Sequence, residues 1–265
     1  MRAVGEILQE FGGLGGPRAA IELLRERIAL VEAGAKPDRA SVSTGWNTID
    51  VQTGGLRRGA IHEWFGVESG DVRSGAQRRV PAWTPPLVIL AHLAKRAGAS
   101  NSWTAWIGRR VWPSAHAIGV EALARCLFID PRTGAERLWA IDAALRVSGL
   151  VVVGDGSGLD AGGSRRLQLA AEAGGSLGLL ARQAHEAAEI SVAATRWSVA
   201  RARSPTGRPA WSVRLVRCKG VQAMGTLGAV VVERRDDGAV ECLSPDVGER
   251  ADAAPTRRRL GAGHG

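Results

Sequence analysis

The segment AIHEWFGVESG, residues 60–70, decides the fold that the sequence predicts. Its first six residues have the pattern of a core strand, and the glycines that follow predict a tight turn. An apolar helix is then expected from Leu87 to about Ala97, because Thr84 has the chemistry of an N-cap residue and Pro85 that of a first helical residue. A strand, a glycine-rich turn and a buried helix in this order form the arrangement in which proteins bind nucleotide phosphates.

Strands and helices alternate downstream of this segment. Strands are predicted at 103–107, 126–129, 150–153 and 177–181, and helices at 134–147 and 164–173. This alternation predicts a mostly parallel sheet with helices on both faces. After about Ser191 the pattern changes to strands without helices, at 195–202, 210–218 and 229–243, with turns at 204–209 and 236–238. The predicted fold class is therefore α/β, a mostly parallel sheet flanked by helices and extended by antiparallel strands at its C-terminal end.

The composition is that of a globular protein. Of the 265 residues, 45% are hydrophobic and 23% are charged, which excludes a chain without a core. No apolar run approaches the roughly 18 residues that a membrane span needs. Glu6 and Glu10 argue against a secretory signal, so a cytoplasmic protein is expected. Cys126, Cys218 and Cys242 lie far apart, so neither a disulfide framework nor a zinc site is predicted.

The sequence is expected to divide into three parts. Ile21, Leu24, Ile28 and Val31 recur at helical spacing, so residues 1–40 should contain an amphipathic helix and a linker. Residues 41–245 should form the α/β core. Residues 246–265, which include an arginine run at 257–259, should form a disordered basic tail.

A basic stretch lies near the end of the predicted core. Between Arg196 and Lys219 the chain carries seven cations and no acid, within a net charge of +9 for the whole sequence. Such a stretch suits a polyanion, and interleaved indoles suit stacking on bases or packing on a partner's apolar surface. We expect DNA or an acidic protein partner to bind here, and the alternative is a solvated strand face. The residues of this predicted surface are Arg196, Trp197, Arg201, Arg203, Arg208, Trp211, Arg214, Arg217 and Lys219.

The turn after the first strand lacks the residues that grip a phosphate. A working phosphate loop reads G-x-x-x-x-G-K-[ST], but Gly70 and Gly75 are followed by Ala76 and Gln77. The two prolines at 85–86 also offer no backbone N–H to an anion. Without the lysine and the hydroxyl that holds Mg²⁺, phosphoryl transfer lacks its two main parts. We therefore predict no catalytic residue, no cofactor and no metal.

Several motifs, in order, resemble the RecA recombinase family. They are TGWNTID at 44–50, GGL at 54–56, RGAI at 58–61, GVES at 66–69, DPRTGAE at 130–136 and RVSGLVVV at 146–153, and the resemblance covers roughly residues 41–220. It implies a RecA-like core. Against the family's motifs, Thr84 falls at the phosphate lysine, Pro85 at the Mg²⁺ hydroxyl and Asp155 near the Walker B aspartate. No acid at 107–109 matches the family's catalytic glutamate.

The resemblance thus implies a vestigial phosphate site. Its positions are Gly66, Glu68, Ser69, Gly70, Thr84 and Asp155. Asp155 is equally compatible with a turn residue in GDGSG, residues 154–158. Arg217 and Lys219 keep the spacing of two cations that, in the family, reach a neighbouring subunit's nucleotide, so a homo-oligomer is among the implied assemblies.

A RecA-like core without the Walker lysine or the catalytic glutamate, preceded by a short helix, resembles the ImuA family, in which RRLQLAAEAGG, here 165–175, recurs. This resemblance implies a noncatalytic accessory factor in SOS-type DNA damage tolerance and translesion synthesis. Its implied partners are an ImuB-like Y-family polymerase homologue, an error-prone polymerase, RecA and DNA. Two alternatives stay open: a divergent RecA-like ATPase that uses Arg73, Arg78 or Arg79 in place of the lysine, and a SulA-like cell-division regulator.

Overall fold

The structure is a computed structural model, which describes residues 40–66, 84–98, 102–220 and 228–243. The predicted amphipathic helix near the N-terminus, the tail at 246–265 and the segment at 67–83 lie outside the described residues. Among the described residues, no helix combines the length and the apolar character that crossing a membrane requires.

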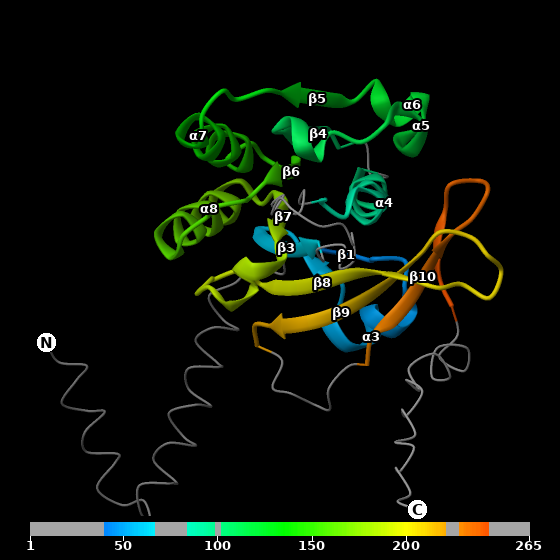
Figure 1. Ribbon diagram of the computed structural model, residues 1–265. Helices are drawn as coiled ribbons and strands as arrows, with labels where there is room; N and C mark the ends of the chain where they lie inside the picture. The colour runs from blue at the N-terminus through cyan, green and yellow to red at the C-terminus, as the bar shows by residue number, and fades with distance from the viewer. Residues whose placement is uncertain (1–39, 67–83, 99–101, 221–227, 244–265) are drawn as a thin grey trace, which may run out of the picture. The chain divides into compact units, whose positions relative to one another are not determined.

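Strand β3, Ala60–Gly66, lies in the middle of the main sheet. In the described part of the chain this sheet has nine strands in the order β11-β10-β9-β8-β3-β7-β6-β4-β5 (Figure 1). The other strands are β4 (Thr104–Ile107), β5 (Cys126–Ile129), β6 (Val151–Asp155), β7 (Leu177–Gln183), β8 (Thr195–Ala202), β9 (Ala210–Cys218), β10 (Val230–Arg234) and β11 (Val240–Cys242). The six strands from β8 to β5 are parallel, whereas β9, β10 and β11 join by successive antiparallel pairs. The predicted α/β class, with antiparallel strands added after the parallel ones, is confirmed.

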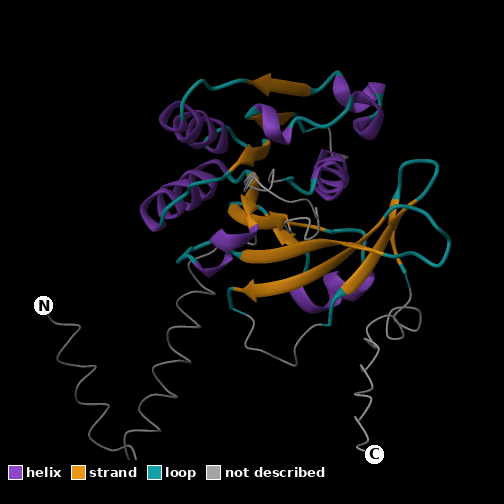
Figure 2. Ribbon diagram, in the orientation of Figure 1, coloured by secondary structure: helices purple, strands orange, loops and turns teal. Residues whose placement is uncertain are grey.

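Helices cover both faces of the parallel strands (Figure 2). The helices are α3 (Asn47–Thr53), α4 (Leu87–Gly98), α5 (Ala115–Ile118), α6 (Val120–Leu123), α7 (Gly134–Leu145) and α8 (Ala161–Gly174), and the short 3₁₀ turns are η2 (Arg109–Val111) and η3 (Ala184–Ala188). α4 packs on one face with the cluster that contains Trp64, and α7 and α8 pack on the other face with the cluster that contains Ile61. A two-stranded ladder of β1 (Ser41–Val42) and β2 (Leu56–Arg57) precedes β3.

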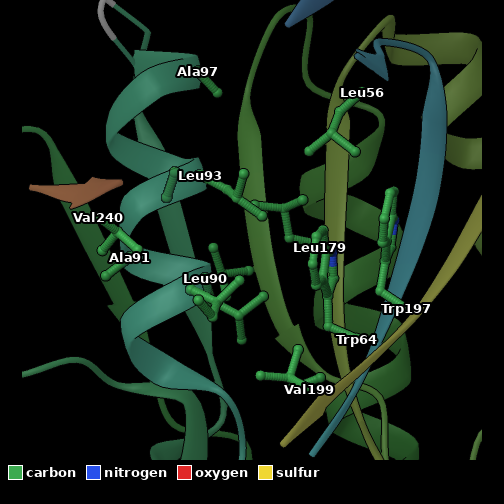
Figure 3. Packing of buried hydrophobic residues seen from close by; sticks show 14 of the residues in the cluster. Leu56, Trp64, Leu90, Ala91, Leu93, Ala97, Leu179, Trp197, Val199 and Val240 are labelled. Atoms are coloured by element: carbon green, nitrogen blue, oxygen red, sulfur yellow. The ribbon is translucent and has the colours of Figure 1, made fainter. Parts of the chain in front are cut away.

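Tryptophans form much of the core under α4. Trp46, Trp64, Trp106 and Trp197 are all buried, and Trp64 stacks on Trp197 with ring centroids 5.2 Å apart. Figure 3 shows leucines of α4 pointing toward this stack and toward Leu179 of β7. Burying rings of this size supplies a large share of the apolar stabilisation of a domain.

A buried hydrogen-bond chain crosses this core. The Nε1–H of Trp197 donates to the hydroxyl of Thr195 at 2.6 Å, and that hydroxyl lies 2.7 Å from Nδ1 of His62. Nε2 of His62 lies 3.1 Å from the carbonyl oxygen of Arg57, so the network assigns the proton to Nε2. Burial lowers the pKa of His62 to about 4. A neutral imidazole satisfies every partner in this chain.

The start of α4 differs from the prediction. The first helical acceptor is the carbonyl of Pro86, which receives the N–H of Leu90 at 3.0 Å, and Pro85 precedes the helix instead of opening it. Thr84 therefore does not occupy the N-cap position. The helix ends at Gly98, one residue beyond the predicted end.

Candidate functional site

The carboxyl ends of four parallel strands meet at one edge of the sheet. β3, β7, β6 and β4 end there at Gly66, Gln183, Asp155 and Ile107. α4 follows β3 on one face of the sheet, and α8 follows β6 on the other face. Open α/β sheets bind ligands at this edge, where successive connections change face. The edge is therefore the first place to look for a site.

Asp155 makes its contacts with the protein itself. Its Oδ1 accepts hydrogen bonds from the backbone N–H of Ser157 at 3.0 Å and from the Ser157 hydroxyl at 2.6 Å. Its Oδ2 lies 3.5 Å from Nη1 of Arg137, and Nη2 of Arg137 donates to the carbonyl of Ser157 at 2.7 Å. The carboxylate is buried. These contacts are those of a turn residue held by an arginine from α7, and we call the three residues the Arg137 clamp.

Gly108, directly after β4, brings two strand ends close together. Its φ of +95° lies in a region that other residues rarely adopt. A Cβ at this position would lie 3.0 Å from the Cβ of Asp155 and 3.6 Å from Cδ of Arg137. Nε of Arg109 pairs with Asp130 at 2.8 Å. The described part of this edge thus has neither a carboxylate at 107–109 nor room for one at Gly108.

Two buried prolines directly precede the helix that would meet a phosphate. Pro85 and Pro86 offer no N–H, and the N–H of Leu87 is already bound to the carbonyl of Pro85 at 2.8 Å. Gly66 ends β3, whereas the other predicted positions in this loop, Glu68, Ser69 and Gly70, lie outside the described residues, and Thr84 is exposed. In the described ranges there is no group of three or more His, Cys, Asp or Glu residues that suits a metal ion.

Two residues of the predicted binding surface are buried, which corrects the sequence-based assignment. Arg196 is 6% exposed and Trp197 is fully buried. The indole of Trp197 belongs to the stack with Trp64, so it does not reach an external partner. The guanidinium of Arg196 pairs with Glu63 of β3, with its Nε 2.7 Å from Oε2. Neither side chain belongs to a surface.

Arg196 is part of a buried ionic network that the sequence did not suggest. Glu63 accepts hydrogen bonds from Arg182 at 3.0 Å and from the Ser191 hydroxyl at 2.7 Å as well as from Arg196. Arg182 also pairs with Glu186 at 3.1 Å. The only advance signal was Glu63, a charged residue inside the mostly apolar first core strand, whereas Arg182 lies just beyond the strand predicted at 177–181.

The remaining cations of the basic stretch are divided between the two faces of the β8–β9 ribbon. Arg201 lies opposite Trp211, and Arg214 lies opposite Ser198. Arg201 and Ser198 are three residues apart on one strand, so they point to opposite faces. The faces are therefore different surfaces: Trp211 packs against the core under α4, and Arg214 lies exposed on the other side.

The exposed cations also differ in what already binds them. Arg208 lies 2.8 Å from Asp236 and 3.7 Å from Glu233, so acids from β10 and its turn neutralise it. Arg217 donates to the carbonyls of Ser191 and Ala193. Within the described ranges, the exposed cations of this stretch with no ion pair are Arg201, Arg203, Arg214, Arg217 and Lys219, and of these Arg217 is held by the two carbonyls.

No protein-family model and no curated protein matches this chain. The assignment of a function therefore depends on the geometry of the carboxyl edge and of the two ribbon faces.

Proposed function

We propose that this chain is a noncatalytic RecA-like accessory factor in DNA damage tolerance, of the ImuA type, which acts by binding. Its partners in this proposal are an ImuB-like Y-family polymerase homologue, an error-prone polymerase and DNA. The observation that carries the proposal is the set of contacts at the carboxyl ends of the parallel strands. The Arg137 clamp holds Asp155, Gly108 leaves no room for a second carboxylate, and two prolines precede α4.

The order of the strands supports the RecA-like part of the proposal. The first core strand, β3, lies centrally, the connection through α4 leads to β4, and later strands fill the gap and extend both sides. A central first strand in a mostly parallel sheet, with the candidate site at the carboxyl ends of the strands, is shared with nucleotide-binding α/β cores. An α/β core of this kind, in which two prolines among the described residues precede α4, is what a noncatalytic relative would retain.

Isothermal titration with Mg-ATP tests the loss of catalysis. We expect no binding heat at millimolar nucleotide and no phosphate release. Micromolar binding that is lost in the double variant Arg78→Ala, Arg79→Ala would overturn the proposal in favour of the divergent ATPase.

Affinity capture from DNA-damaged cells tests the pathway. The tagged full-length chain should retain polymerase subunits in damaged cells. Retention of cell-division proteins in their place would favour the SulA-like alternative and contradict the proposal.

DNA binding is tested by separating the two ribbon faces. Fluorescence anisotropy measures the affinity for a labelled single-stranded oligonucleotide. This affinity should fall in either the Arg201→Glu, Arg203→Glu variant or the Arg214→Glu, Lys219→Glu variant, and it should also fall as the salt concentration rises. Both variants change the net charge equally, so a difference between them identifies the face. Equal, salt-insensitive affinity in both would remove DNA from the proposed partners.

A further inference from the structure

A shallow groove runs along the outer side of α4. It consists of two adjoining hollows with volumes of about 630 Å³ and about 310 Å³, which share Ala91 and Lys95 of α4. The larger hollow extends toward α6 and β5, and the smaller one toward the β10–β11 turn. We call the two together the α4 groove.

The floor of the α4 groove is apolar. Val88 and Ala91 line it from α4, Ile118 lines it from α5, and Ala122 lines it from α6. Because the alanine side chains are small, they leave space in which aliphatic side chains of a partner fit without any rearrangement of the helices. Trp106 also lines the larger hollow, with its side chain almost fully buried.

The rims of the α4 groove are positively charged. Lys95 and Arg96 lie at its middle, Arg125 at one end and Arg234 at the other, and Glu121 is the one carboxylate among its described lining residues. Arg96 donates only to oxygens of Ser43, and no ion pair engages the other three cations within the described ranges.

The acids near the groove do not neutralise this positive charge, and His92 does not add to it. Asp236 is bound to Arg208 at 2.8 Å, and Asp237 lies 3.8 Å from Arg235, so both acids of the neighbouring turn already have partners. Burial lowers the pKa of His92, so this lining residue is neutral at neutral pH. The charge of the groove therefore comes from lysine and arginine and is complementary to an anionic partner.

The choice between a nucleic acid and an acidic peptide follows from the floor. Sites for single-stranded nucleic acid combine cations with exposed aromatic rings on which bases stack. The described lining of the α4 groove has one aromatic ring besides His92, that of Trp106, which is only 1% exposed. Aliphatic anchors with flanking carboxylates match both the floor and the rims.

We propose that the α4 groove binds an acidic peptide segment of a partner protein, with aliphatic side chains on the alanine floor and carboxylates paired with Lys95, Arg125 and Arg234. This surface is separate from the face of the β8–β9 ribbon that carries Arg214. The inference does not require the chain to be a RecA-like accessory factor, because it depends only on the shape and charge of the groove.

Fluorescence polarisation with a labelled synthetic peptide tests this inference. The probe is a short peptide of Leu and Glu in which leucines recur at helical spacing, and the protein is the full chain. We expect saturable binding. In the double variant Lys95→Glu, Arg234→Glu, the affinity should fall by about tenfold or more, because two rim ion pairs become repulsive.

Two further variants separate the groove from general charge effects. Arg214→Glu with Lys219→Glu changes the net charge by the same amount, with Arg214 on the opposite face of the β8–β9 ribbon, and should leave affinity for the peptide unchanged. Ala117→Trp fills the smaller hollow without changing charge and should also weaken binding. Circular dichroism checks that each variant is folded, and the charge-reversal pair tests the groove even if the tryptophan variant is not.

Matched probes decide what the groove recognises. A peptide with Ser in place of Leu, and one with Gln in place of Glu, should both bind at least about tenfold more weakly. Equal binding of the serine peptide, equal losses in both charge variants, or a labelled oligonucleotide that binds the groove more tightly than the peptide would each overturn the inference.

Discussion

Replacing Arg196 by alanine tests whether this residue stabilises the fold or lies on a surface. Its Nε is 2.7 Å from Glu63, its Nη1 and Nη2 donate to the carbonyls of Ala187 at 3.0 Å and Glu186 at 3.2 Å, and its guanidinium carbon lies 4.9 Å from the centre of the Phe65 ring. Breaking a buried ion pair by removing one partner costs about 3–5 kcal/mol, because the other charge stays buried.

The expected loss lies at the lower end of this range. Glu63 keeps the hydrogen bonds from Arg182 at 3.0 Å and from the Ser191 hydroxyl at 2.7 Å, so it is not left alone. We therefore expect Arg196→Ala to lower the free energy of unfolding by about 3 kcal/mol. With an m value of roughly 3 kcal/mol/M, the urea midpoint should fall by about 1 M.

Urea unfolding followed by tryptophan emission measures this change, since the Trp64 and Trp197 stack reports on the same core. Arg201→Ala, an exposed arginine on the same strand, is the matched control and should change stability by less than about 0.5 kcal/mol. Equal midpoints for the two variants would refute the reasoning. The double variant Glu63→Gln, Arg196→Met should be more stable than the sum of its single variants predicts, since it removes both charges together.

Three further predictions concern other parts of the core. Burial lowers the pKa of His62 to about 4, against a value near 6.5 in the unfolded chain, so the unfolded state binds more protons between these pH values. The contribution of His62 to stability is therefore full above about pH 6.5 and falls by about 3 kcal/mol toward pH 4. An NMR titration of the His62 imidazole with a midpoint near 6.5 would contradict this prediction. Gly108→Ala should lower the free energy of unfolding by about 1–3 kcal/mol, since a Cβ there is 3.0 Å from the Cβ of Asp155. Gly119→Ala, at a similar positive φ but with open space around it, should lower it less when both variants are measured by urea unfolding. Asp160→Ala should lose about 1 kcal/mol because the Asp160 side chain caps α8, with Asp160→Asn retaining most of the stability in thermal unfolding.

The sequence predicted the parallel part of the sheet well, since its signals are local. The strand at 126–129 and the helix start at Gly134 match β5 and α7 directly, and Thr133 caps α7 by accepting the N–H of Glu136. The start of α4 was predicted less well, because a proline suits a first helical position, whereas the helix begins at Leu87 and the carbonyl of Pro86 is its first acceptor.

The basic surface was predicted less well, because counting charges along a window ignores acids that arrive from elsewhere. The window from Arg196 to Lys219 contains no acid, yet Glu63 comes from β3 and Glu233 from β10. Both strands are hydrogen-bonded neighbours of the ribbon, in the sheet order β10-β9-β8-β3. Two of the cations are thereby neutralised by partners that are distant in sequence.

The two-residue period of a strand could have shown that the cations of this window do not share one face. Arg201 and Arg214 were assigned to one surface because they are close in sequence, but the pairing of β8 with β9 places them on opposite faces. A ribbon with cations on both faces does not form one binding site. It offers either two weak surfaces or one surface and one set of solubilising charges.

The two prolines before α4 and the α4 groove lie at different ends and sides of one helix. In a phosphate-binding core, the helix after the first strand works through its N-terminus, where free N–H groups face the anion. Here Pro85 and Pro86 remove donors at that end, and the cations of α4, Lys95 and Arg96, lie in its last turn beside the groove. Cations near a helix C-terminus also interact favourably with the helix dipole, so they are kept at little cost in stability. The cations of α4 therefore lie at its C-terminal end and along its outer side, beside the groove that we propose as the binding site for an acidic peptide.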